Sequence, residues 1–168
     1  MKILLISTLM ILGGCAYQAD GLLSTRELRN YRALAPGITR DMGMSEFIDL
    51  VALSPYPPGP PGPIAIGILE GCPVVGEARI TGREEILRLA ESLAEGIRNV
   101  DRDVFMCFNP RHGIRYVAGG KQVVMLVCFE CRRGQIFAEG KKIEFLTAAA
   151  PEPTWDAIFA THGLFKVK

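Results

Sequence analysis

Residues 113–129, Gly113-Ile-Arg-Tyr-Val-Ala-Gly119-Gly120-Lys-Gln-Val-Val-Met-Leu-Val-Cys-Phe129, decide the fold. The Gly119-Gly120 pair between two strand-like runs predicts a two-residue hairpin turn, whose central residues both take positive φ. This turn sets the register, with His112 opposite Val127 and Cys107 opposite Arg132. Residues 123–129 are apolar without alternation, which predicts a strand covered on both faces.

Further strand-like runs and turn signals surround this hairpin. We expect strands at residues 47–53, 64–69, 74–80 and 104–108, and a second hairpin that joins residues 135–138 to 142–146. Apolar and β-branched residues between turn-forming residues are the basis for each of these strands. Residues 25–34 and 154–161 predict two short helices.

The longest helix is predicted from Thr81 to about Arg98. Thr81 and Glu84 have the spacing of a capping box, with threonine as N-cap and glutamate three residues later. The apolar residues of this helix share one face at helical spacing: Ile86, Leu89, Ala90, Leu93 and Ile97. Together these elements predict an α+β domain, an antiparallel β-sheet with one major and one minor helix packed on it.

The N-terminus has the features of a targeting segment. Lys2 precedes a mostly apolar run at residues 3–12, which is too short to span a bilayer, since a spanning helix takes about 20 residues. Leu12-Gly13-Gly14-Cys15 resembles the lipobox of bacterial lipoproteins. The resemblance implies cleavage after Gly14 and a lipid-carrying Cys15, whose several acyl chains form a stable membrane anchor. Ala16, rather than an aspartate, follows Cys15, so the resemblance also implies that the protein is anchored in the outer membrane and faces the periplasm.

The sequence thus divides into four segments. Residues 1–14 are the expected lipoprotein signal peptide, and residues 15–24 are a lipidated tether. Residues 25–63 are an N-terminal segment that ends in a Pro-rich loop. Residues 64–168 are the α+β domain with the cysteine-containing hairpin.

Composition and charge limit the classes of partner. The chain has 168 residues, of which 49% are hydrophobic and 22% charged, as in a single domain with a real core. Its net charge is +1, and no block of like charge is present. Because phosphate binding needs a clustered basic face, we expect no nucleic-acid partner. The expected partners are the membrane, through the lipid, and a protein or small ligand.

The candidate site lies in Cys107-Phe-Asn-Pro-Arg-His-Gly-Ile114 and Cys128-Phe-Glu-Cys131. These two motifs resemble the paired C-F-x-P-R-H-G-I and C-F-E-C signatures of a group of uncharacterised bacterial proteins, many of them exported. The similarity covers residues 64–168 and implies the domain boundaries, but it implies no activity.

The hairpin geometry bears on how the cysteines meet. Pro110 cannot donate to a ladder, and a one-residue bulge there would move Cys107 opposite Cys131, within disulfide range. In a straight strand the Cα atoms of Cys128 and Cys131 are about 10 Å apart. A disulfide between them therefore requires the strand to end in a turn near Phe129, as in a redox dithiol.

Three interpretations of the cysteines stay open. A structural Cys107–Cys131 disulfide would form in an oxidising compartment and would close a loop of about 25 residues, worth about 3 kcal/mol. Alternatively, Cys107, His112, Cys128 and Cys131 form a set compatible with tetrahedral zinc. In the third interpretation the thiols are buried and free, or redox-active.

Two hypotheses for function follow. His112 is the best general acid–base candidate, because Arg111 and Glu130 can share its side of the hairpin and form a polar site with it. We identify no phosphate-binding loop, nucleophile elbow or metalloprotease motif, so an enzyme is not favoured. The first hypothesis is a membrane-anchored lipoprotein that serves as a structural or binding module of the cell envelope. The second is a zinc-binding or thiol-redox protein that uses the Cys107, His112, Cys128 and Cys131 set.

Overall fold

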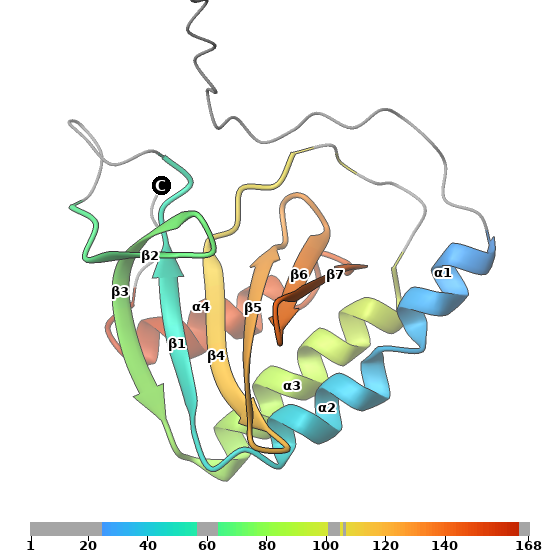
Figure 1. Cartoon of the computed structure of the whole chain (residues 1–168), viewed down its shortest axis with the longest axis horizontal. Coiled ribbons are helices and arrows are strands. Elements are labelled where there is room, and N and C mark those ends of the chain that lie inside the picture. The colour runs from blue at the N-terminus through green and yellow to red at the C-terminus, as the bar shows by residue number, and fades with distance from the viewer. Residues whose placement is uncertain (1–24, 57–63, 101–104, 106, 165–168) are drawn as a thin grey trace, which may run out of the picture.

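The protein forms a curled, seven-stranded antiparallel sheet with helices packed on it, an α+β fold as predicted (Figure 1). The computed structural model describes residues 25–56, 64–100, 105 and 107–164. The helices are α1 (Thr25–Arg32), α2 (Ala35–Gly43), α3 (Arg83–Arg98) and α4 (Glu152–Thr161). The strands are β1 (Ile48–Leu53), β2 (Gly67–Leu69), β3 (Cys72–Ile80), β4 (His112–Ala118), β5 (Lys121–Cys128), β6 (Arg133–Ala138) and β7 (Lys141–Leu146). The strand order is β2-β3-β1-β4-β5-β6-β7.

The central β4–β5 hairpin has the predicted register. Gly119 and Gly120 have φ of 57° and 79°, the left-handed conformations that a two-residue turn of this type needs. His112 pairs with Val127, and the ladder runs without a shift to Ala118 and Lys121. The predicted second hairpin is also present as β6–β7, with its turn at Glu139 and Gly140.

One face of the sheet carries the main core. Residues from α2, α3 and α4 form a single apolar cluster with alternate residues of the central strands. The predicted stripe of α3 lies in this cluster, and Ile86, Leu89, Leu93 and Ile97 are each at most 1% exposed. α2 was not predicted from the sequence, and it packs beside α3.

The opposite face of the sheet carries a second, smaller core. We call it the second apolar cluster, and it consists of Val51, Leu53, Val74, Val124 and Leu126, with Leu69, Cys72, Phe108 and Phe137 packed around it. Residues 123–128 of β5 are all buried, because even-numbered side chains enter this cluster and odd-numbered ones face the helices. The predicted burial of this strand on both faces is therefore confirmed.

Three local predictions are wrong. α3 begins at Arg83 with Gly82 as N-cap and no side-chain cap, so the predicted Thr81 and Glu84 capping box is not formed. Phe105, Cys107 and Phe108 are not in a strand, although residues 104 and 106 lie outside the described part. The strand expected at residues 64–69 is reduced to β2.

The predicted N-terminal segments lie largely outside the described residues. This holds for the signal peptide, the tether and residues 57–63 of the Pro-rich loop. The helix expected at residues 25–34 is present as α1. Within the described ranges, no helix is long and apolar enough to cross a membrane.

Candidate functional site

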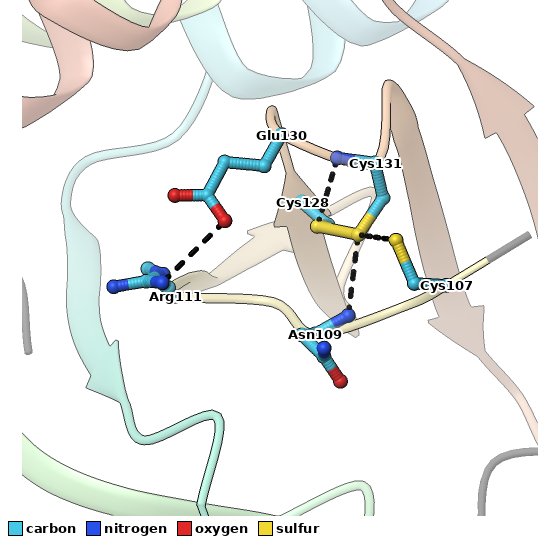
Figure 2. Close-up of a disulfide and its surroundings, with 6 residues drawn as sticks. All are labelled: Cys107, Asn109, Arg111, Cys128, Glu130 and Cys131. Atoms are coloured by element: carbon cyan, nitrogen blue, oxygen red, sulfur yellow. Dashed lines mark hydrogen bonds and ion pairs between the residues drawn. A yellow bond between two sulfur atoms is a disulfide. The ribbon is translucent and has the colours of Figure 1, made fainter. Parts of the chain in front are cut away.

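A disulfide joins Cys128 and Cys131 across the connection between β5 and β6 (Figure 2). β5 ends at Cys128 and β6 begins at Arg133, so Cys131 lies in the turn between them. This turn is closed by a hydrogen bond in which the Arg132 N–H donates to the Phe129 carbonyl at 3.1 Å. The turn brings the Cα atoms of the two cysteines to 5.1 Å, and a disulfide tolerates at most about 7 Å. The condition derived from the sequence, that the strand end near Phe129, is met.

Cys107 approaches this disulfide from the segment that precedes β4. Its Sγ atom lies 3.2 Å from Sγ of Cys131 (Figure 2). Cys107 is exposed, whereas Cys128 and Cys131 are only 2% and 1% exposed. The structure thus brings three sulfur atoms together, and among the three cysteines only Cys107 lies at the surface.

Backbone N–H groups point at both sulfur atoms of the disulfide. The Asn109 N–H donates to Sγ of Cys131 at 3.4 Å, and the Cys131 N–H donates to Sγ of Cys128 at 3.1 Å. Sulfur accepts hydrogen bonds weakly when it is neutral and much better as a thiolate. The second contact therefore favours negative charge on Cys128 when its bond to Cys131 breaks.

The predicted bulge at Pro110 is wrong, although Cys107 does reach Cys131. The β4–β5 ladder ends at the pair His112 and Val127, and Pro110 lies before the strand in a buried position. Because proline has no N–H to donate, it ends the ladder here. The carbonyl of Arg111 instead accepts a hydrogen bond from the N–H of Leu53 in β1 at 3.0 Å. An irregular segment, rather than a shifted strand, carries Cys107 to the disulfide.

His112 does not join the cysteines, which corrects the predicted four-residue cluster. Its side chain is 4% exposed and faces the helices, with Nε2 2.8 Å from the Asp156 carboxylate of α4. The imidazole also packs edge-on against Phe129, Trp155 and Phe159. The reason is strand alternation: His112 and its partner Val127 share the helix face, so Cys128, one residue later, points to the other face.

Arg111 and Glu130 do meet, beside the disulfide. One guanidinium nitrogen of Arg111 lies 3.4 Å from the Glu130 carboxylate (Figure 2). The Arg111 side chain is 18% exposed and that of Glu130 is 51% exposed. The contact joins the segment before β4 to the turn, and as a partly exposed ion pair it contributes little energy. Arg111, Glu130 and His112 also line one small pocket together with Cys128, so the predicted polar pair lies beside His112.

The arrangement does not fit the zinc interpretation. His112 lies on the wrong face, and two of the three cysteines are joined in a disulfide. In the part of the chain that the structure describes, no group of three histidine, cysteine or carboxylate side chains is placed to hold a metal ion.

Two contacts at the site could not be found from the sequence. Asp156, which binds His112, lies on a helix far away in the chain. Phe105 lies beneath the guanidinium of Arg132, at 5.1 Å from the ring centre. Neither pair has a spacing that indicates contact, since both depend on how the sheet and its flanking segments pack.

A separate open hollow, of about 730 Å³, lies among β4, β5, the β6–β7 hairpin and the β2–β3 turn. Its lining carries four cations, Arg115, Lys121, Lys141 and Lys142, and two carboxylates, Glu70 and Glu139. Three of the cations are in ion pairs, Arg115 with Glu77, Lys121 with Glu139 and Lys142 with Glu144, which leaves Lys141 as the unpaired cation among the described residues of the lining. Leu69, Val124 and Phe137 form part of its lining. None of the three cysteines of the site lines this hollow.

No family model matches this chain, and no curated protein or solved structure is detectably similar to it. The function proposed below therefore rests on the geometry of the site. A thiol in contact with a disulfide sulfur has one characteristic reaction, thiol–disulfide exchange.

Proposed function

We propose that this chain is a lipid-anchored protein of the bacterial cell envelope whose Cys128–Cys131 pair cycles between disulfide and dithiol. The observation that carries the redox role is the third sulfur atom, that of Cys107, at 3.2 Å from Cys131. A disulfide that only staples a fold needs no thiol beside it. Exchange, in contrast, begins with a thiolate at contact distance from a disulfide sulfur.

The position of the disulfide also favours redox work over stapling. Cys128 and Cys131 are three residues apart. In the chain-entropy model, closing so short a loop stabilises the folded state by about 2 kcal/mol, compared with about 3.5 kcal/mol for a loop of 25 residues. The β5–β6 ladder and the Arg132–Phe129 hydrogen bond already close this turn. The bond therefore restricts the unfolded chain less than a disulfide between distant segments would.

The lipid anchor is proposed from the sequence alone. Leu12-Gly13-Gly14-Cys15 supplies the lipobox, and Cys15 would carry the acyl chains. This location is consistent with the site, because disulfides form and persist outside the cytoplasm. We place the protein at the outer membrane, facing the periplasm.

Equilibration with a dithiol buffer tests the redox role. The purified protein is incubated in mixtures of reduced and oxidised dithiothreitol, and its thiols are then trapped by acid and alkylated. We expect the Cys128–Cys131 pair to pass from disulfide to dithiol while the near-ultraviolet circular dichroism stays native. A pair that is reduced only when the protein unfolds would contradict the proposal, because such a bond is structural. Cys72→Ser serves as the matched control and should titrate as the wild type does.

The open hollow favours a second function, the binding of an anionic amphiphile. Its volume of about 730 Å³ suits a small organic ligand, and Lys141 presents a positive charge beside the apolar part of the lining. A ligand with a negative group and an apolar body would match both kinds of lining. This function would make the protein a binding module of the cell envelope.

Binding of 1-anilinonaphthalene-8-sulfonate, an anionic amphiphile, tests the second function. We expect the native protein to enhance its fluorescence with saturation and Lys141→Glu to weaken the binding. Arg98→Glu, a charge reversal at the exposed end of α3, is the matched control. Equal loss in both variants, or no saturable binding, would contradict this function.

A further inference from the structure

We infer that Cys107 is the relay thiol through which an external dithiol reduces the buried Cys128–Cys131 disulfide. The inference rests on the proposed redox function, because a relay has meaning only if that pair is reducible in the folded protein. It assigns Cys107 as a catalytic residue and names the co-substrate as a dithiol.

Burial is the first reason for a relay. Cys128 and Cys131 are 2% and 1% exposed, so an external thiolate lacks the open line of approach that attack on a disulfide requires. Cys107 is exposed, and its Sγ contacts Sγ of Cys131 (Figure 2). An exposed sulfur atom is thus in contact with a buried disulfide.

The first step is exchange within the protein. Cys107 loses its proton to water, and its thiolate attacks Sγ of Cys131, because that is the sulfur it touches. The Cys107–Cys131 bond forms as the Cys128–Cys131 bond breaks, and the electron pair of the broken bond leaves on Sγ of Cys128. The Cys131 N–H, 3.1 Å from that sulfur, donates a hydrogen bond to the new thiolate. The disulfide has now moved to a pair with one exposed member.

The second step transfers two electrons from outside. One thiolate of the external dithiol attacks Sγ of Cys107, forming a mixed disulfide, and Cys131 leaves as a thiolate. The second thiolate of the dithiol then attacks its partner sulfur in the mixed disulfide and releases Cys107. The external dithiol ends as a disulfide, Cys128 and Cys131 end as two thiols, and the two protons of the dithiol pass to them. Cys107 is regenerated.

The position of Asn109 is consistent with this route. Its N–H donates to Sγ of Cys131 at 3.4 Å, which holds the attacked sulfur beside Cys107. The Arg111–Glu130 contact fixes the same segment against the turn. Such positioning raises the effective concentration of Cys107 at the disulfide far above that of a free thiol.

The rate of reduction by dithiothreitol in native buffer tests the relay. The wild type, Cys107→Ser and Cys72→Ser are mixed with reduced dithiothreitol, quenched with acid at intervals, alkylated and mapped by mass spectrometry. We expect Cys107→Ser to lose the Cys128–Cys131 bond at least about tenfold more slowly than the wild type, because it lacks the preplaced thiol. Cys72→Ser should react at the wild-type rate. In denaturant, where burial no longer matters, all three proteins should react alike.

A second arm avoids dependence on one variant. Cys107 is alkylated with iodoacetamide in the folded, oxidised Cys72→Ser protein, and the same slow reduction is expected. Equal native rates with and without the Cys107 thiol would overturn the relay but leave the redox function standing. A disulfide that resists dithiothreitol in every native protein would overturn the redox function and, with it, the relay.

Discussion

Replacing Cys128 by serine should move the disulfide to Cys107 and Cys131. The variant removes the sulfur that leaves in the first exchange step and keeps the 3.2 Å contact between the other two. At the site, oxidation can then join only Cys107 to Cys131. The Cys131 N–H, which donates to Sγ of Cys128, can donate to the serine hydroxyl instead, and the Arg132–Phe129 hydrogen bond still closes the turn, so the fold should persist.

The energetic consequence of this shift follows from loop length. Cys107 and Cys131 are 24 residues apart, whereas Cys128 and Cys131 are three apart. In the chain-entropy model, reduction should lower the free energy of unfolding by about 3.5 kcal/mol in Cys128→Ser. In Cys107→Ser, which keeps the native bond, the expected loss is about 2 kcal/mol.

Urea unfolding followed by far-ultraviolet circular dichroism measures both losses, with and without a reducing agent. Cys107→Ser is the matched control, because each variant retains two of the three cysteines. If Cys107 and Cys131 are both alkylated in oxidised Cys128→Ser, or if reduction leaves its stability unchanged, the contact between Cys107 and Cys131 is refuted.

Three further predictions concern the core and the anchor. Leu93→Ala should lower the free energy of unfolding by about 2–5 kcal/mol, because Leu93 is fully buried in α3. Glu91→Ala, at an exposed position of the same helix, should change it by less than about 0.5 kcal/mol. Urea unfolding measures both variants, and equal effects would contradict the packing of α3. Gly134→Ala should cost about 1–3 kcal/mol, because its Cβ would overlap the buried ring of Phe145; an unchanged melting temperature would contradict this contact. Cys15→Ser should abolish fatty-acid labelling and leave unprocessed precursor in cells, and labelling that survives the change would refute the lipid anchor.

The hairpin at the centre of the fold could be predicted because its information is local. Gly119-Gly120 permits few turn conformations, and a turn of known type fixes which residues pair. The alternation of side chains then also excludes His112 from the cysteine cluster, since its partner Val127 and Cys128 point to opposite faces. This consequence was present in the sequence, and it conflicts with the predicted set of Cys107, His112, Cys128 and Cys131.

Other features depended on contacts between distant segments. Glu85 in the first turn of α3 binds His162 at the end of α4, a contact that the spacing of the two residues does not indicate. The path of Cys107 is set by packing of Phe108 on the second apolar cluster. Residues 104–108 are apolar enough to predict a strand, yet Phe105, Cys107 and Phe108 lie outside the strands of the sheet. Spacing along the chain holds no signal for such contacts.

Disulfide mapping of the purified protein under native conditions tests whether the three sulfur atoms form one site. The protein is trapped by acid, alkylated and digested, and its linked peptides are identified by mass spectrometry. We expect a dominant Cys128–Cys131 linkage with Cys107 recovered as an alkylated thiol. Partial reduction should add a Cys107–Cys131 linkage before the dithiol form accumulates. A stable disulfide from Cys107 to Cys72, or a protein that retains zinc with its cysteines reduced, would contradict the three-sulfur site.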